Sequence, residues 1–209
     1  HTLTFIDSWL SLRSAWAEIP GFVVAIAKDG KLLFNKAYGY ANIEAQEAMR
    51  PDHVFRIASH SKTFTATVLF QLQEEKALRI DDPAAMYLPW LREHADTRWS
   101  NVTIRQLLSH SAGVIRDGSN SEYWKTREPF PDLEQFKRDI LEQPLVVESN
   151  TRFKYSNYGY ALLGCIIDNI TGMTYHEAVT ARIIEPLGLK NTVPEYREGD
   201  SETYATGYS

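Results

Sequence analysis

Apolar positions follow a helical period at the start of the chain and then change to a strand-like run. In residues 3–17 apolar side chains recur at roughly helical intervals, and a Pro-Gly pair at 20–21 closes this segment. Residues 22–42, "FVVAIAKDGKLLFNKAYGYAN", form two β-rich runs joined by Asp29 and Gly30. Asp-Gly between such runs is the strongest short-range hairpin signal. The pattern therefore predicts a helix followed by an antiparallel hairpin.

From residue 55 onward the helical period dominates. Apolar residues spaced three and four apart predict a mostly buried helix that begins near Ser59. The later predicted elements are a turn-rich connector at 78–91, a short helix at 103–113 ending in Gly113, an amphipathic helix from Asp132 to Gln143, a helix at 158–172 with Gly172 near its end, and a helix from Tyr175 to about Leu187. A single hairpin is a marginal sheet, so these strands need more partners than the visible pattern supplies.

Composition and charge narrow the class of function. The 209 residues are 44% hydrophobic and 23% charged, which is typical of a folded globular chain. A net charge of -5 with both signs mixed along the chain argues against a nucleic-acid or anionic-membrane surface, and a neutral or small ligand fits better. The sequence has no apolar run of about 18 residues and hence no predicted membrane span.

Cysteine and histidine usage predicts neither a disulfide framework nor a metal site. The single cysteine, Cys165, has apolar neighbours and is interpreted as a buried structural thiol. His53, His94 and His176 lack the carboxylate or cysteine spacing of a metal centre. We therefore expect no metal and no cofactor.

Ser59 and Lys62 lie three residues apart where the buried helix is predicted to begin. Residues three apart are neighbours on a helix surface, so the lysine amine can approach the serine hydroxyl and act as a base once its pKa is lowered. Backbone N–H groups at the helix start, that of Ser59 first, can stabilise an oxyanion. Alternatively, Ser59 is a helix cap and Lys62 a solvated residue. A second motif, Tyr155-Ser156-Asn157, precedes another buried helix. In an extended segment, Tyr155 and Asn157 point to the same side.

Three segments together carry a family resemblance: "FRIASHSKTFTATVLFQLQEEKALRIDDPAAMYLP", "TIRQLLSHSAGV" and "FKYSNYGYALLGCIIDNITG". The chain resembles the serine β-lactamase and penicillin-binding protein superfamily from about residue 22 to 207. It is most similar to the class C branch, which includes D-alanyl-D-alanine carboxypeptidases, D-aminopeptidases and esterases. The resemblance implies that Ser59 is the acylated nucleophile and that Lys62 helps to deprotonate it. It implies that Tyr155 shuttles protons, and that Asn157 binds Lys62 and the substrate.

The resemblance also implies the fold. It implies an α/β (α+β) protein of the β-lactamase/transpeptidase type, with an antiparallel sheet flanked by helices and a helical lobe. The family's third motif, a Lys or His followed by a small residue and Gly, has no match, and Ala205-Thr206-Gly207 is interpreted as a structural landmark. We therefore expect residues 1–209 to be one catalytic domain, incomplete at its C-terminus and in its sheet. Residues 1–58 would form the helix and hairpin, and residues 59–190 the mainly helical lobe.

Three other candidate residues are expected to be structural, and one position departs from the family's pattern. His60 is expected to pack, Ser61 to lie off the face of Ser59, and His110 to buttress the active-site helices. Lys76 stands where many relatives have glycine. Because a left-handed non-glycine residue costs on the order of 1 kcal/mol, a different helix cap is expected there.

The predicted function is a serine hydrolase that forms an acyl-enzyme with a β-lactam, a D-amino-acid peptide or an ester. The competing hypothesis is a non-catalytic sensor, binding or assembly protein that retains the fold. A plain helical interaction module is contradicted by the two motifs occurring together. The expected partner is a small-molecule or peptide substrate, with no nucleic acid. The resemblance favours a periplasmic or extracellular location.

Overall fold

The computed structural model describes residues 2–118, 122–125, 128–196 and 203–208, without the side chains of 124 and 125. It divides into two compact units. The first, called the sheet unit, comprises residues 1–57 and 190–209, and the second, called the helical unit, comprises residues 58–189. The division of the chain into one catalytic domain with these two parts remains a prediction.

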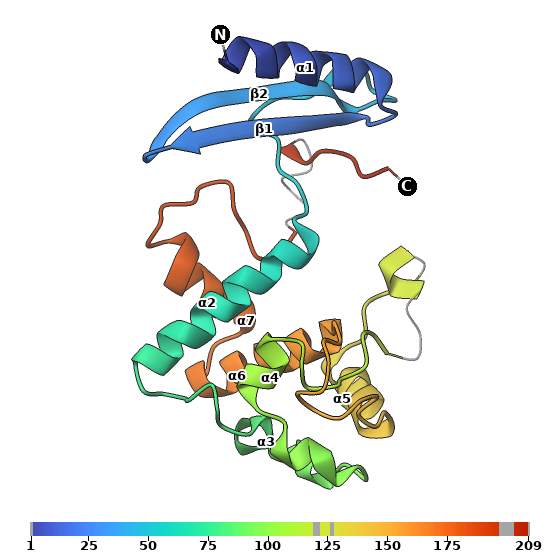
Figure 1. The fold of residues 1–209 in the computed structure, drawn as a ribbon, viewed down its shortest axis with the longest axis vertical. Helices are drawn as coiled ribbons and strands as arrows, with labels where there is room; N and C mark the ends of the chain where they lie inside the picture. Colours follow the sequence, from blue (N-terminus) through green and yellow to red (C-terminus); the bar gives the residue numbers. More distant parts are fainter. Residues whose placement is uncertain (1, 119–121, 126–127, 197–202, 209) are drawn as a thin grey trace. The chain divides into compact units, whose positions relative to one another are not determined.

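The sheet unit contains one helix and a small antiparallel sheet (Figure 1). Helix α1 spans Thr2–Trp16, and the strands are β1 (Gly21–Lys28), β2 (Lys31–Asn42) and β3 (Glu47–Ala48), in the order β1-β2-β3. Asp29 and Gly30 have φ values of 51° and 72°, as a two-residue hairpin turn with matching twist requires. The predicted opening helix and hairpin are confirmed, and the sheet is not closed.

Helix α1 is fastened to β2 by one acidic side chain. Asp7 accepts hydrogen bonds from the Lys36 ammonium and from the Tyr38 hydroxyl, the latter at 2.7 Å. These two bonds hold the pKa of Asp7 below its usual value. Burial, together with the Asp7 carboxylate, raises the pKa of Tyr38 to about 12. The contact therefore depends on an ionised Asp7 and a protonated Tyr38.

The helical unit holds the remaining elements (Figure 1). They are η1 (Ala58–His60), α2 (Ser61–Glu74), α3 (Ala84–Tyr87), η2 (Pro89–Glu93), η3 (Thr97–Asn101), α4 (Ile104–Leu108), η4 (Glu122–Lys125), α5 (Leu133–Glu142), α6 (Asn157–Thr171), α7 (Tyr175–Val179) and η5 (Thr180–Ile184). One continuous apolar core runs through this unit from Val68 to Ile184. Helices α2 and α6 contact each other, and Leu69 and Leu163 are completely buried. The helical periodicity of the sequence accounts for this core, because it places apolar residues on the shared faces.

The helix predicted to begin near Ser59 is α2, and two other predicted helices differ from the structure. Helix α2 begins at Ser61, after the 3₁₀ turn η1 that contains Ser59. Helix α4 ends at Leu108, so the prediction that it ends in Gly113 was wrong. Gly113 instead has a φ of 82° and packs its Cα against the Val147 carbonyl, where a side chain would clash. The last predicted helix changes to π-helical geometry at Thr180.

The end of helix α2 also contradicts a prediction. Lys76 has a φ of 61°, so it occupies the left-handed position where a different cap was expected. The N–H groups of Ala77 and Lys76 donate to the carbonyls of Leu72 and Gln73 at 2.9 Å each. This pair of bonds defines a Schellman cap, which normally has glycine at its left-handed position. The two bonds maintain the cap despite the lysine side chain.

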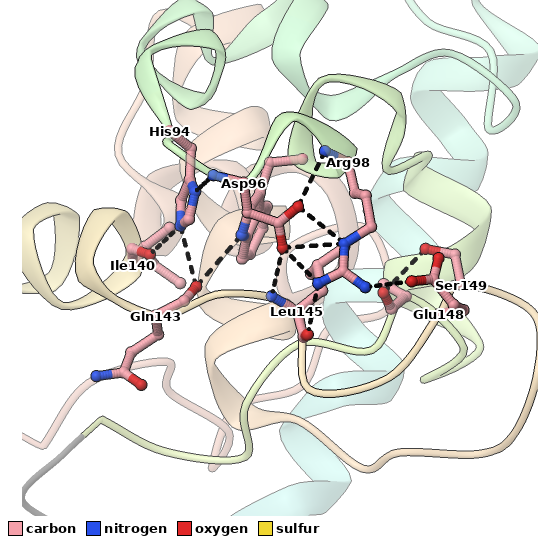
Figure 2. A network of polar contacts seen from close by, with 10 residues as sticks. His94, Asp96, Arg98, Ile140, Gln143, Leu145, Glu148 and Ser149 are labelled. Carbon is pink, nitrogen blue, oxygen red and sulfur yellow. Dashed lines mark hydrogen bonds and ion pairs between the residues drawn. The ribbon is translucent and has the colours of Figure 1, made fainter.

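The irregular segments of the helical unit are joined by a polar network (Figure 2). Asp96 caps η3, pairs with Arg98 at 2.6 Å and accepts the N–H of Leu145 at 3.0 Å. His94 Nδ1 accepts the N–H of Asp96, so Nε2 carries the proton that meets the carbonyls of Ile140 and Gln143 at 3.1 and 3.0 Å. The Arg98 bonds hold the pKa of Asp96 far below its usual range. The segment at 94–101 is thereby connected to the chain that follows α5.

Candidate active site

The segment that carries Ser59 is a strained turn leading into helix α2. Ala58 has a φ of 45°, a left-handed value that is unusual for alanine. Ser59 is exposed within η1, whereas Lys62, the second residue of helix α2, is half-buried. The sequence places the two residues three apart, and the fold presents the serine to solvent with the lysine behind it. His60 is exposed, so the prediction that it packs was wrong within this chain.

The Tyr155-Ser156-Asn157 motif begins helix α6. Ser156 is extended, with φ -141° and ψ 121°, and its hydroxyl accepts the N–H of Gly159 at 2.8 Å as the N-cap. The same hydroxyl donates to the Ile115 carbonyl at 2.6 Å. Ser156 is buried, and its hydroxyl is used in these two structural hydrogen bonds. The side chains of the residues before and after Ser156, Tyr155 and Asn157, face the start of helix α2.

The four predicted site residues meet in two pairs. The Ser59 and Tyr155 hydroxyl oxygens are 2.6 Å apart, which is a short hydrogen bond. Lys62 Nζ donates to Asn157 Oδ1 at 2.7 Å. The same ammonium lies 4.9 Å from the centre of the Tyr155 ring and 5.4 Å from that of Tyr160. A serine hydroxyl, a phenol, an amine and an amide are thus assembled from two segments almost 100 residues apart.

The charged and hydrogen-bonding groups around Tyr155 lower the pKa of its phenol. Burial alone would raise the pKa of Tyr155, but its hydrogen-bonding interactions with Lys62 and Ser59 and the charges of Lys62 and Arg116 outweigh it. The net effect is a Tyr155 pKa below the ordinary value for tyrosine. By contrast, burial raises the pKa of the neighbouring Tyr160. Tyr155 therefore ionises more readily than Tyr160 does.

The His110 ring packs against the Tyr155 ring. Its ring centre lies 4.5 Å from that of Tyr155 and 5.0 Å from that of Tyr160. Its Nδ1 accepts the N–H of Ser156 at 3.1 Å. Burial, and secondarily the charge of Lys62, lowers the pKa of His110 and favours the neutral ring. These contacts agree with the structural role that the sequence predicts for His110.

Two further residues of the site were not found by sequence reasoning. The Arg116 carbonyl accepts the N–H groups of Asn157 and Tyr158, at 2.8 and 3.2 Å. Asp117 Oδ1 accepts a hydrogen bond from Asn157 Nδ2 at 2.8 Å. Both residues lie in a polar loop about 40 positions before Asn157, and their spacing gives no signal of this contact.

An apolar cavity lies next to the amide. It has a volume of about 300 Å³, and Asn157 is one of the residues that line it. Most of its other lining residues are apolar or aromatic: Tyr123, Phe130, Pro131, Leu133, Phe136, Tyr158 and Ala161. An apolar group can therefore be accommodated beside Asn157.

The described part of the chain contains no cluster of three His, Cys, Asp or Glu side chains suited to hold a metal ion. In the same residues, no helix combines the length and the apolar character needed to cross a membrane.

Burial raises the pKa of the Cys165 thiol to about 11, so this cysteine is a poor nucleophile.

The fold is of the β-lactamase/transpeptidase type, and the chain belongs to the Beta-lactamase family, whose model matches residues 8–209. The teichoic acid D-alanine hydrolase of Staphylococcus aureus (strain MRSA252) is 28% identical over 186 residues, covering 89% of this chain and 44% of the relative. Among solved structures, EstCE1, a hydrolase with promiscuous acyltransferase activity, gives a TM-score of 0.84 at 27% identity, covering 99% of this chain and 56% of that one. A class C β-lactamase from Rhodobacter sphaeroides gives 0.78 at 28% identity, covering 97% and 54%.

The matches confirm the predicted superfamily and its class C branch, together with the α/β fold. The chain spans only 38 to 44% of the length of the curated relatives that it matches. The family is one of β-lactamase-fold hydrolases, and the particular activity of this protein is therefore a matter of proposal.

Proposed function

We propose that the protein is a serine acyl-transfer hydrolase in which Ser59 is acylated by a β-lactam, a D-amino-acid peptide or an ester. The observation that carries this proposal is the 2.6 Å contact between the Ser59 hydroxyl and a phenol whose pKa is lowered. A serine hydroxyl needs an adjacent base to attack a carbonyl, and Tyr155 provides one in its phenolate form next to Lys62. Residues 1–209 form part of one catalytic domain in this proposal.

In the acylation step, Ser59 Oγ forms a bond to the carbonyl carbon while its proton passes to the Tyr155 oxygen. Lys62 contributes by its positive charge, which increases the share of Tyr155 in the phenolate form that can take this proton. The tetrahedral intermediate then collapses, the bond to the leaving group breaks, and Tyr155 returns the proton to that group. The backbone N–H of Ser59 is the proposed first oxyanion donor.

In the deacylation step, water attacks the ester formed at Ser59. Tyr155, again an anion beside Lys62, accepts a proton from the water and returns it to Ser59 Oγ as the acyl bond breaks. Asn157 holds Lys62 and donates its amide N–H to the acyl group. The apolar cavity beside Asn157 suits a substrate with an apolar acyl substituent.

The relatives support this range of substrates. One relative is named as a hydrolase of D-alanine from teichoic acid, one as an acyltransferring hydrolase and one as a β-lactamase. All three names describe transfer of an acyl group from oxygen or nitrogen, and the same four side chains can serve each reaction.

The test is the hydrolysis of an activated ester by the full-length protein and by two serine variants. Ser59→Ala should lose roughly 10⁴-fold or more of the rate, because the nucleophile is removed. Ser61→Ala is the matched control, since this exposed serine lies two residues further on, at the start of helix α2, and it should retain the rate. Turnover by Ser59→Ala at the original rate would contradict the mechanism. Rapid acylation without release would instead indicate the non-catalytic receptor.

A further inference from the structure

The Asn157 amide lies between two partners of opposite hydrogen-bonding character. Lys62 Nζ is 2.7 Å from its oxygen, and Asp117 Oδ1 is 2.8 Å from its nitrogen. A lysine ammonium can only donate hydrogen bonds, and a carboxylate can only accept them. An amide held between them has one orientation that satisfies both, with its oxygen toward the lysine and its nitrogen toward the aspartate.

Asp117 is itself firmly held. Its side chain is only 12% exposed, and Arg116 Nε lies 3.2 Å from its second oxygen. The backbone of the same loop is fixed to the start of helix α6, because the Arg116 carbonyl accepts two of the first N–H groups of that helix. The carboxylate therefore cannot easily move away when the amide is disturbed.

We propose that Asp117 is a positioning residue that acts through Asn157, an inference that rests on the proposed function. With the amide oxygen fixed on Lys62, the amine always donates toward Asn157, whether it is charged or neutral. The remaining hydrogens of the Lys62 amine, or its lone pair when the amine is neutral, then point toward Tyr155 and Ser59. The second hydrogen of Asn157 Nδ2 is left to donate to the acyl group of the substrate.

Without Asp117 the amide could turn over. A reversed amide would present N–H to the lysine, would lose the Lys62 contact while the amine is charged, and would no longer donate to the substrate. Asp117 could instead serve only to fasten the loop to helix α6. The two roles differ in one respect: positioning requires Asn157, whereas fastening does not.

A double-mutant cycle separates them. Acylation of the full-length protein by an activated ester is measured for wild type, Asp117→Ala, Asn157→Ala and the double variant. Asp117→Ala should slow acylation roughly 10- to 100-fold in the wild-type background, as expected for misplacement of reacting groups. In the Asn157→Ala background the same substitution should change the rate less than about 2-fold. An equal loss in both backgrounds, or no loss in wild type, would overturn the proposal.

Two further variants keep the result interpretable. Asp117→Asn retains the shape of the side chain but allows both amide orientations, so it should give an intermediate loss, and it can replace Asp117→Ala in the cycle if that variant does not fold. Asp139→Asn is the matched control. Asp139 accepts the Tyr158 hydroxyl at 2.6 Å, so it also ties the first turn of helix α6 to the rest of the unit. The Asp139→Asn substitution weakens this hydrogen bond, so it should lower the melting temperature without changing the rate of acylation.

A second readout does not depend on acylation. The Asn157 side-chain amide protons, assigned by their absence in Asn157→Ala, should exchange slowly with solvent in wild type and quickly in Asp117→Ala. Unprotected protons in wild type would overturn the positioning role even in a protein that reacts. A protein that is never acylated at Ser59, yet shows this protection, would disprove the proposed function and leave the Asp117 contact standing.

Discussion

The two units bury their apolar residues to very different degrees. The helical unit has a continuous core of fully buried side chains, whereas helix α1 of the sheet unit leaves Phe5 71% and Trp16 86% exposed. Buried apolar area is the main source of folding free energy. The helical unit therefore has the core needed to hold the four site residues in place, while the sheet unit buries fewer apolar side chains.

The largest expected effect tests this difference in packing. Leu163→Ala, in the helical core, should lower the free energy of unfolding by about 2–5 kcal/mol, because it removes buried methyl groups and leaves a cavity. Phe5→Ala, on the exposed face of α1, should change it by less than about 0.5 kcal/mol. Urea unfolding followed by circular dichroism measures both variants. A Phe5→Ala cost as large as that of Leu163→Ala would show that this face of α1 is covered in solution.

A smaller loss of stability is expected when one acidic residue in each unit is replaced by its amide. The pKa of Asp96 is lowered on folding, so its contribution is present above the unfolded pKa of about 4 and is lost as the pH falls below it. Asp96→Asn should therefore cost roughly 2 kcal/mol at pH 7, and the difference from wild type should shrink below about pH 4.

Asp7 in the sheet unit is the comparison. Its pKa is lowered in the same direction by Lys36 and Tyr38, but it holds fewer partners than Asp96, so Asp7→Asn should cost less at pH 7. Thermal unfolding between pH 3 and 7 measures both. A cost of Asp96→Asn that does not vary with pH would contradict the assigned role of the charge.

The smallest expected effect concerns the cap of helix α2. Lys76→Gly should stabilise the helical unit by about 1 kcal/mol, because glycine adopts a left-handed φ without a Cβ clash. Lys76→Ala is the control, since it removes the ammonium but keeps the Cβ, and it should give no gain. Equal melting temperatures for the glycine and alanine variants would show that the left-handed position carries no strain.

Local features of the fold were predictable from the sequence. Asp29-Gly30 determines the hairpin, and Gly172 at φ 66° ends helix α6 where the sequence places it. Each of these depends on the conformational preference of a few adjacent residues. The left-handed Lys76 and the π-helical turn at Thr180 were not predicted, because neither residue type prefers that conformation locally.

The site was predictable only in part. Spacing alone suggested Ser59 with Lys62 and Tyr155 with Asn157, but only the family resemblance linked the two pairs. The structure brings them together through contacts between helices α2 and α6. Asp117 had no signal at all, because an aspartate in a polar loop is usually solvated. Its role depends on a contact that folding alone creates.

The most direct test of the central claim is the intact mass of the full-length protein before and after incubation with a penicillin and with an activated ester. We predict an added mass equal to the acyl group, located on Ser59 by peptide mapping and absent from Ser59→Ala. The rate at which the added mass disappears would distinguish a hydrolase from a receptor. A folded protein that gains no mass from either reagent, or gains it on another residue, would contradict the account.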